Sequence, residues 1–546
     1  MNLKKFFLGF ALSLMTVNAF SQQVERPKLV VGIVVDQMRW DYLYRYQDRY
    51  GKGGFNRLLN EGFSYENTLI NYIPTFTAIG HATIYTGSVP AIHGIAGNDF
   101  IMQLSGEEMY CTQDDSVNGV GSTGKAGKMS PKNLLTSTVT DQLKLATNFR
   151  SKVFGVAIKD RGGILPAGHF ADAAFWFDGE TGNWISSTFY MDKLPNWLVK
   201  LNQSKFTDHY LKEWNTLYPI KTYVNSDADD NIYEGTFKGE KKPTFPRNLK
   251  ALQKDNGYGL IRTTPYGNTI TIDLAKQVIE HEKLGKNEKG ITDFLAMSFS
   301  STDYIGHQFG INSIEIEDTY LRLDRELEEF FNYLDQQIGK GEYLVFLTAD
   351  HGASHNPRYF QDKKGNAGYF EIGEVKKNLN AHLAQLFGAD ELVRSLYNYQ
   401  IHLNYPIVEA NKINEIELKD AIIKFMEKVD GVSFAVDTER IGYASVPQKL
   451  RERIVNGYHK KRSGAIQYIV DPQWYSGKQN STGTTHGTWA SYDAHIPFVL
   501  MGWGIKHGKS YDEVYMTDIA PTISSLLKIE APNGNIGDAR SDAFAK

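Results

Sequence analysis

Runs of apolar residues recur along the chain and alternate with amphipathic segments. The first run, residues 29–35 (LVVGIVV), is apolar at every position except its glycine and is followed by Asp36. Such continuous runs are typical of strands that are buried on both faces of a parallel sheet. Further strands are predicted to end at Lys159, just before Asp303, at Asp350 with His351 and, near the C-terminus, within residues 495–504.

The segments between these runs have the periodicity of helices. Ser313 can cap a helix whose apolar positions, from Tyr320 to Leu334, recur three or four residues apart. Thr517 is expected to open another helix. The alternation predicts an α/β fold with a doubly wound, mostly parallel central sheet flanked by helices. Ligands of such sheets bind beyond the carboxyl ends of the strands.

Two long regions fit this alternation poorly. Residues from about 165 to 265 are rich in Trp, Tyr, Asn and Gly, and residues from about 357 to 480 mix helix and strand patterns. We interpret both as insertions that build a cap over the carboxyl edge of one core sheet. Residues 22–546 are thus expected to form one catalytic domain.

The first 21 residues have the pattern of a signal peptide. Lys4 and Lys5 precede an apolar run over residues 6–15, and Ala19 and Ser21 suit cleavage. The apolar run is too short to span a bilayer, and no cysteine near the cleavage region could carry a lipid. We expect an exported protein, periplasmic or secreted, without a stable membrane anchor.

Composition narrows the possible functions. The 546 residues are 41% hydrophobic with a formal net charge of -4, which disfavours bulk binding of nucleic acid. Cys111 is the only cysteine, so no internal disulfide can form. Stability is therefore expected to come from the core, with bound metal as a second source.

Carboxylate and imidazole side chains gather at the predicted strand ends. Asp303 and His307 are four residues apart, so a helical turn would direct both the same way. Alone, an aspartate at a strand end could be a structural cap, and an Asp–His pair four residues apart could be a surface contact. Together the motifs supply six oxygen and nitrogen ligands, which suit zinc, with manganese or iron as alternatives, and which divide into two sites of three. The six are Asp36, Asp303, His307, Asp350, His351 and His486.

The stretch NYIPTFTAIGHATIYTG places a threonine where a helix is expected to begin. Pro74 ends an extended segment, and the helix can start immediately after Thr77. Free N–H groups at a helix N-terminus favour an anion such as phosphate. By itself Thr77 is explained as a helix cap, but a metal ion at its hydroxyl would make it a nucleophile.

The motifs VVDQMRWD, PTFTAIGHATIYTGSVPAIHGI, SSTDYIGH, TADHG and TTHGT resemble, in order, those of the alkaline phosphatase superfamily. They are most similar to bacterial phosphate-irrepressible alkaline phosphatases that use a threonine nucleophile. The resemblance implies one zinc ion on Asp303, His307 and His486, and a second on Asp36, Asp350, His351 and the hydroxyl of Thr77. It also implies that Asn98, Lys159 and Arg161 contact the phosphoryl group.

An exported di-zinc phosphomonoesterase is therefore predicted, acting through a phosphothreonine at Thr77 and releasing inorganic phosphate from small phosphate monoesters. A monomer is expected. A nucleotide pyrophosphatase or phosphodiesterase of the same superfamily is the first alternative, but Lys159 and Arg161 suit the greater charge of a monoester. A sulfatase is disfavoured because the nucleophile region lacks the Cys/Ser-x-Pro-x-Arg pattern. A non-catalytic binding protein that is stabilised by its metals is the remaining alternative.

Overall fold

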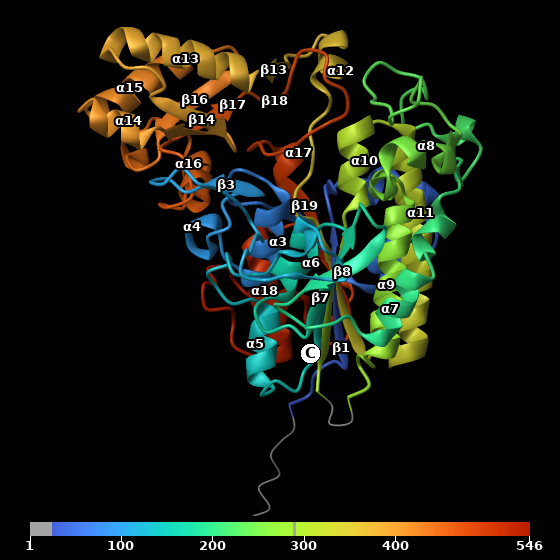
Figure 1. Ribbon diagram of the computed structural model, residues 1–546. Helices are drawn as coiled ribbons and strands as arrows, with labels where there is room; N and C mark the ends of the chain where they lie inside the picture. Colours follow the sequence, from blue (N-terminus) through green and yellow to red (C-terminus); the bar gives the residue numbers. More distant parts are fainter. Residues whose placement is uncertain (1–23, 288–290, 546) are drawn as a thin grey trace, which may run out of the picture.

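A mixed central sheet divides the molecule, and helices cover both of its faces (Figure 1). The computed structural model describes residues 24–287 and 291–545, so the predicted signal peptide, residues 1–21, lies outside the described residues. Within these residues the sheet has eleven strands in the order β20-β2-β19-β12-β1-β11-β6-β7-β8-β5, with β21 beside β2. The predicted α/β fold is confirmed.

The parallel centre of the sheet is built from the continuous apolar runs. β1 (Leu29–Val35) pairs in parallel with β11 (Asp293–Phe299) and β12 (Tyr343–Thr348), and β6 (Val153–Ala157) extends the sheet in parallel beyond β11. Every residue of these four strands is buried. Their carboxyl ends consequently lie at one edge of the sheet, where the predicted polar residues follow them.

Antiparallel pairings join further strands to both sides of the sheet, at β19 on one side and between β7 and β8 on the other. β19 (His495–Gly502) is antiparallel to β12, a direction that its sequence did not indicate. β7 (Ala173–Asp178) and β8 (Asn183–Ser187) fall in the region expected to be an insertion, yet both are strands of the central sheet. The remaining strands are β2 (Phe63–Leu69), β5 (Gly119–Val120), β20 (Gly508–Ser510) and β21 (Val514–Tyr515).

Two groups of helices pack on the two faces (Figure 1). One face carries α3 (Thr77–Thr86), α5 (Val139–Ala146), α6 (Asp160–Ala167) and α18 (Ile519–Leu527). The other carries α2 (Phe55–Glu61), α9 (Tyr266–His281), α10 (Ser301–Phe309) and α11 (Ile314–Leu334). No described helix is both long enough and apolar enough to cross a membrane.

The two predicted helix caps have different outcomes. The hydroxyl of Ser313 accepts a hydrogen bond from the N–H of Ile316, so Ser313 caps α11 as predicted. Thr517 does not cap a helix, because a 3-10 turn over Met516–Asp518 precedes α18. Asp518 is the residue before α18, and its backbone is already helical.

Residues 393–470 form a second, smaller sheet beside the carboxyl edge of the main one (Figure 1). Its order is β14 (Val393–Tyr397), β15 (Gln400–Leu403), β17 (Ile466–Val470) and β16 (Val432–Asp437), and every pairing is antiparallel. Its helices are α13 (Ile372–Phe387), α14 (Tyr405–Ala410), α15 (Glu415–Met426) and α16 (Gln448–Gly457). A separate buried cluster that includes Leu379, Ile401, Ile422 and Tyr468 forms the core of this unit.

Short helices and strands lie in the segments between the larger elements. Residues 196–256 contain α7 (Asn196–Gln203), α8 (Leu249–Asn256) and the two-residue strands β9 (Glu213–Trp214) and β10 (Arg247–Asn248). The other short elements are α1 (Tyr42–Arg45), α4 (Pro90–His93), α12 (Pro357–Asp362), α17 (Ser491–Ala494), β3 (Asp99–Ile101), β4 (Glu108–Tyr110), β13 (Gly368–Phe370) and β18 (Trp474–Ser476).

Candidate active site

The first group of candidate metal ligands joins α10 to a distant loop. Asp303, His307 and His486 each offer a ligand atom, and these atoms lie within 4.8 Å of one another. Asp303 and His307 lie one turn apart on α10, with Nε2 of His307 3.1 Å from Oδ1 of Asp303. Nε2 of His486 lies 3.6 Å from the same oxygen. The helical spacing that the sequence indicated thus brings two of the ligands together.

The second group lies at the ends of two neighbouring parallel strands. Asp36 follows β1, and Asp350 and His351 follow β12. Nε2 of His351 is 3.5 Å from Oδ1 of Asp36 and 3.5 Å from Oδ2 of Asp350. All three side chains are fully buried. Parallel pairing of β1 with β12 therefore accounts for the meeting of residues more than 300 positions apart.

The three imidazoles of these groups share one orientation. In each ring Nδ1 lies at hydrogen-bond distance from a backbone carbonyl, which fixes the tautomer with the proton on Nδ1 and the lone pair on Nε2. The partners are Thr484 O for His307 (2.8 Å), Gly352 O for His351 (2.9 Å) and Thr75 O for His486 (2.7 Å). Bonds of this type orient histidine ligands in metalloproteins. All three Nε2 atoms face carboxylates of their own group.

Two orphaned carboxylate oxygens show that the residues fit metal ions. Oδ1 of Asp36 and Oδ2 of Asp350 are buried without a hydrogen-bond partner among the described residues. Burial, reinforced by the charge of Asp350, raises the pKa of Asp36 well above its usual range. A buried anionic oxygen without a partner is costly, and a cation compensates it. Carboxylate oxygens and imidazole nitrogens without thiolates suit zinc or a similar divalent metal.

Thr77 lies beside the second group at the start of a helix. It is the first residue of α3 rather than the residue before it, and its side chain is buried. Its Oγ1 is 3.4 Å from Nε2 of His351 and 3.4 Å from Nζ of Lys159. The hydroxyl is therefore held between an imidazole and an ammonium group.

Lys159 connects the two groups. It precedes α6, two residues after the end of β6 rather than at the strand end itself. Its Nζ donates to Oδ2 of Asp36 at 2.7 Å and to Oδ2 of Asp303 at 2.5 Å. Burial lowers the pKa of Lys159, but the two carboxylates outweigh burial and raise it, so the side chain is charged.

Asn98 and Arg161 complete the set of predicted site residues. Oδ1 of Asn98 accepts from the N–H of Ala78, at 2.9 Å, so the carboxamide is fixed at the N-terminus of α3 and Nδ2 remains a donor for another acceptor. Arg161 lies in the first turn of α6 and donates from Nη1 to the hydroxyl of Tyr110 at 3.0 Å. Its buried Nε has no hydrogen-bond partner in the part of the chain that the structure describes.

Nearby histidines have structural bonds. Nδ1 of His81 pairs with the carbonyl of Thr77 at 2.9 Å, and Nδ1 of His93 accepts from a backbone N–H. His81 also lies 3.3 Å from Oδ2 of Asp350.

Sequence reasoning missed two residues of this site, Gln37 and Tyr304. The ring of Tyr304 lies 5.1 Å from Nζ of Lys159, and Gln37 donates to a carboxylate of each group. Gln37 and Tyr304 each directly follow an aspartate that is a candidate metal ligand, and that adjacency is the signal that could have identified them.

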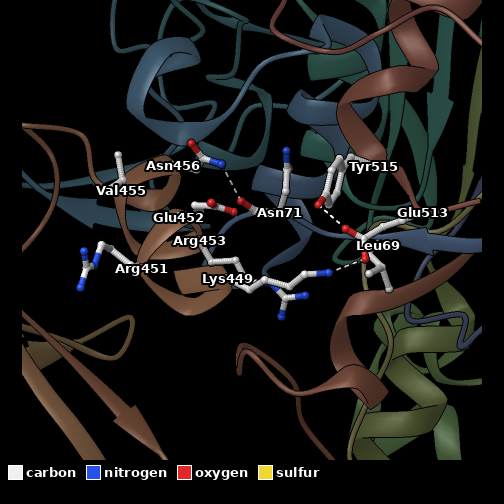
Figure 2. A pocket seen from close by; sticks show the side chains of 10 residues that line it. All are labelled: Leu69, Asn71, Lys449, Arg451, Glu452, Arg453, Val455, Asn456, Glu513 and Tyr515. Carbon is white, nitrogen blue, oxygen red and sulfur yellow. Dashed lines mark hydrogen bonds and ion pairs between the residues drawn. The ribbon is translucent and has the colours of Figure 1, made fainter. Parts of the chain in front are cut away.

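The smaller sheet's unit contacts the segment before Thr77, residues 71–76, through α16. Nδ2 of Asn456 donates to the carbonyl of Asn71 at 2.8 Å (Figure 2). Both residues line a cavity of about 310 Å³. The N–H of Ile73 donates to the carbonyl of Arg453 at 3.2 Å. Gly457 permits the close approach, because a Cβ there would lie 1.7 Å from the carbonyl oxygen of Ile73. The segment before Thr77 is thus held from outside the central fold.

Comparison with known proteins adds independent information. Residues 30–493 match the family model of type I phosphodiesterases / nucleotide pyrophosphatases. The chain is 66% identical over 525 residues to a protein of Myroides odoratus named calcium-transporting ATPase, covering 96% of both chains. It is 51% identical to alkaline phosphatase PhoV of Synechococcus elongatus, covering 96% of this chain and 94% of PhoV.

A third relative, alkaline phosphatase PafA of Elizabethkingia meningoseptica, is 49% identical over 546 residues, which cover 100% of this chain and 99% of PafA. The crystal structure of wild-type PafA superposes with a TM-score of 0.93, covering 96% of this chain and 100% of that one. A PafA variant in which a threonine, an asparagine, a lysine and an arginine are replaced together gives a TM-score of 0.92 at 48% identity, with the same coverage.

Proposed function

We propose that this chain, which belongs to the type I phosphodiesterase / nucleotide pyrophosphatase family of the alkaline phosphatase superfamily, hydrolyses phosphate monoesters. Two relatives that match nearly its whole length are named alkaline phosphatases. The observation that carries the proposal is the position of Thr77. Its hydroxyl lies at the start of α3 and within 3.4 Å of both His351 and Lys159, next to two groups that fit metal ions.

Two zinc ions are the proposed cofactors. Asp303, His307 and His486 would hold one ion, and Asp36, Asp350 and His351 the other, together with the hydroxyl of Thr77. Metal ions bound there would lower the pKa of the Thr77 hydroxyl and stabilise the charge on the attacking and leaving oxygens.

The chain's own residues supply the remaining chemistry. Oγ1 of Thr77 loses its proton and attacks phosphorus in line, so an O–P bond forms as the P–O bond to the leaving group breaks. The leaving alkoxide takes up a proton and departs as an alcohol. Water then hydrolyses the phosphothreonine, which regenerates the Thr77 hydroxyl and releases inorganic phosphate.

Three side chains would bind the non-bridging phosphoryl oxygens. Lys159 and Arg161 supply two cations, and Nδ2 of Asn98 supplies a neutral donor. Charge-assisted bonds of this kind stabilise a phosphoryl group as its charge redistributes in the transition state. Two cations suit a dianionic monoester better than a monoanionic diester, so we favour the monoesterase over the phosphodiesterase that the family description also covers.

The location and assembly of the enzyme are part of the proposal. We propose an exported monomer that is periplasmic or secreted, in which residues 357–480 form a cap over the active site. The bonds from α16 to Asn71 and Ile73 support a cap that also positions the nucleophile segment.

The decisive experiment compares turnover of p-nitrophenyl phosphate with that of bis(p-nitrophenyl) phosphate by the metal-loaded protein, with ATP as a third substrate. We expect the monoester to be preferred, and acid quenching with mass spectrometry to find phosphate on Thr77. Metal analysis is expected to give about two zinc ions per chain. A faster reaction with the diester would assign the chain to the phosphodiesterases instead.

A further inference from the structure

A strained turn lies at the centre of the site. Directly after β1, residues 35–38 form a turn that is closed by the N–H of Met38 donating to the carbonyl of Val35 at 3.2 Å. Gln37 is its third residue and has a φ of 63°. Turns with positive φ at this position ordinarily carry glycine or asparagine, because a longer side chain is strained there. A buried glutamine at this position therefore needs an explanation other than turn chemistry.

Gln37 is hydrogen-bonded to one carboxylate of each metal-ligating group. Its backbone N–H donates to Oδ1 of Asp350 at 3.1 Å. Its side-chain Nε2 donates to Oδ1 of Asp303 at 2.6 Å. The N–H of His351 also donates to Oδ1 of Asp350, so that oxygen accepts two hydrogen bonds, whereas Oδ2 accepts none from residues 24–287 and 291–545. The left-handed conformation of Gln37 allows its backbone and its side chain to hydrogen-bond two different carboxylates.

α10 leaves space for the side chain of Gln37 at one glycine. Gly306 lies between Asp303 and His307 on α10, and a Cβ there would lie 1.9 Å from Oε1 of Gln37. Glycine is unfavourable inside a helix, so the space it leaves serves the carboxamide. Lys159 also donates hydrogen bonds to both groups, but its ammonium is proposed to bind the substrate as well. The proposed mechanism gives the neutral amide of Gln37 no role in substrate binding.

We propose that Gln37 is a positioning residue, which orients Asp303 and Asp350 toward their metal ions and fixes the two groups relative to each other. The role rests on the proposed function to the extent that metal ions bind these groups. Removal of a residue that hydrogen-bonds a metal ligand typically weakens metal binding by about 10- to 100-fold.

The test measures metal affinity rather than turnover alone. Gln37→Met keeps the length of the side chain and removes its donor, whereas Gln37→Asn suits a positive φ but is too short to reach Asp303. Competition with a chelator gives the zinc dissociation constants. The absorption spectrum of the cobalt-substituted protein reports on the coordination of the Asp303 group, and thermal melting reports on folding. Gln400→Met is the matched control, because Gln400 is a buried, hydrogen-bonded glutamine in the smaller sheet.

We expect both Gln37 variants, and Gly306→Ala, to bind at least one zinc ion about 10- to 100-fold more weakly and to alter the cobalt spectrum, with Gln400→Met unchanged in both. Gln37→Asn decides the matter if Gln37→Met does not fold. Wild-type affinity in Gln37→Asn, or an equal loss in Gln400→Met, would overturn the positioning role. A wild-type protein without bound metal or phosphatase activity would instead contradict the proposed function.

Discussion

Nζ of Lys159 lies 2.7 Å from Oδ2 of Asp36, and the same ammonium donates to Asp303 in the other group of candidate metal ligands. One buried cation is thus shared by carboxylates that follow different strands. The proposed function requires the same group to contact a phosphoryl oxygen, so Lys159 is placed to neutralise charge on both protein and substrate.

Replacing Lys159 with alanine is expected to lower kcat/KM for p-nitrophenyl phosphate by roughly 100- to 1000-fold, the usual effect of removing one charge-stabilising donor. The loss with the diester should be smaller, because a monoanion gains less from the cation. Lys144→Ala is the control, since Lys144 is also buried and ion-paired but bonds Asp172 and the carbonyl of Ser151. Equal losses with both substrates would argue against a role in neutralising the dianion.

Removal of the Thr77 hydroxyl should abolish the covalent route. Thr77→Ala is expected to lose roughly 1000-fold or more in kcat, whereas Thr77→Ser keeps a hydroxyl and should retain activity. Thr83→Ala serves as control, because Thr83 is a buried threonine of the same helix whose hydroxyl pairs with His93. Steady-state kinetics and acid-quench mass spectrometry measure both effects, and unchanged turnover in Thr77→Ala would refute the nucleophile assignment.

Much of this site was predictable because its signals are local or topological. The spacing of Asp303 and His307 is a helical repeat, and Asp36 and Asp350 follow apolar runs whose parallel pairing puts them at one edge. The contacts of Gln37 were not predictable, since they depend on a turn with positive φ. The prediction of the sheet was less complete. The antiparallel direction of β19 and the inclusion of β7 and β8 in the central sheet depend on tertiary pairing, which no local sequence pattern indicates.

Metal removal should destabilise the protein. Without a cation, Oδ1 of Asp36 and Oδ2 of Asp350 stay buried with no hydrogen bond from any described residue. Zinc at 100 times its dissociation constant would contribute about 2.7 kcal/mol per site to the free energy of unfolding. Dialysis against a chelator is therefore expected to lower the melting temperature and remove activity, and added zinc to restore both. A melting temperature that does not change would show that the ions do not bind the folded state.

Acid should destabilise the fold through His93. Burial, with the nearby charges of His459 and Arg462, lowers the pKa of His93 to about 3. The unfolded state, with a pKa near 6.5, takes up a proton first, so stability is full above pH 6.5 and falls as the pH drops toward 3. At pH 5 the resulting loss in the free energy of unfolding is about 2 kcal/mol. Urea unfolding at pH 8 and pH 5 should show a smaller acid loss in His93→Gln than in the wild type, and no such difference in His507→Gln, where the histidine is exposed.

The contact between α16 and the nucleophile segment should affect turnover from outside the metal groups. In Gly457→Ala the new Cβ would lie 1.7 Å from the carbonyl oxygen of Ile73, so α16 or the segment before Thr77 must shift. A displacement of about 1 Å in a reacting group can cost as much as 100-fold, so we expect kcat to fall measurably while both zinc ions are retained. Gly373→Ala is the control, because a Cβ at that position of α13 meets open space and alanine favours a helix. If kcat in Gly457→Ala equals that of the control, the smaller sheet's unit does not position Thr77; a fall in kcat with unchanged metal content would make α16 part of the machinery that holds the nucleophile in line.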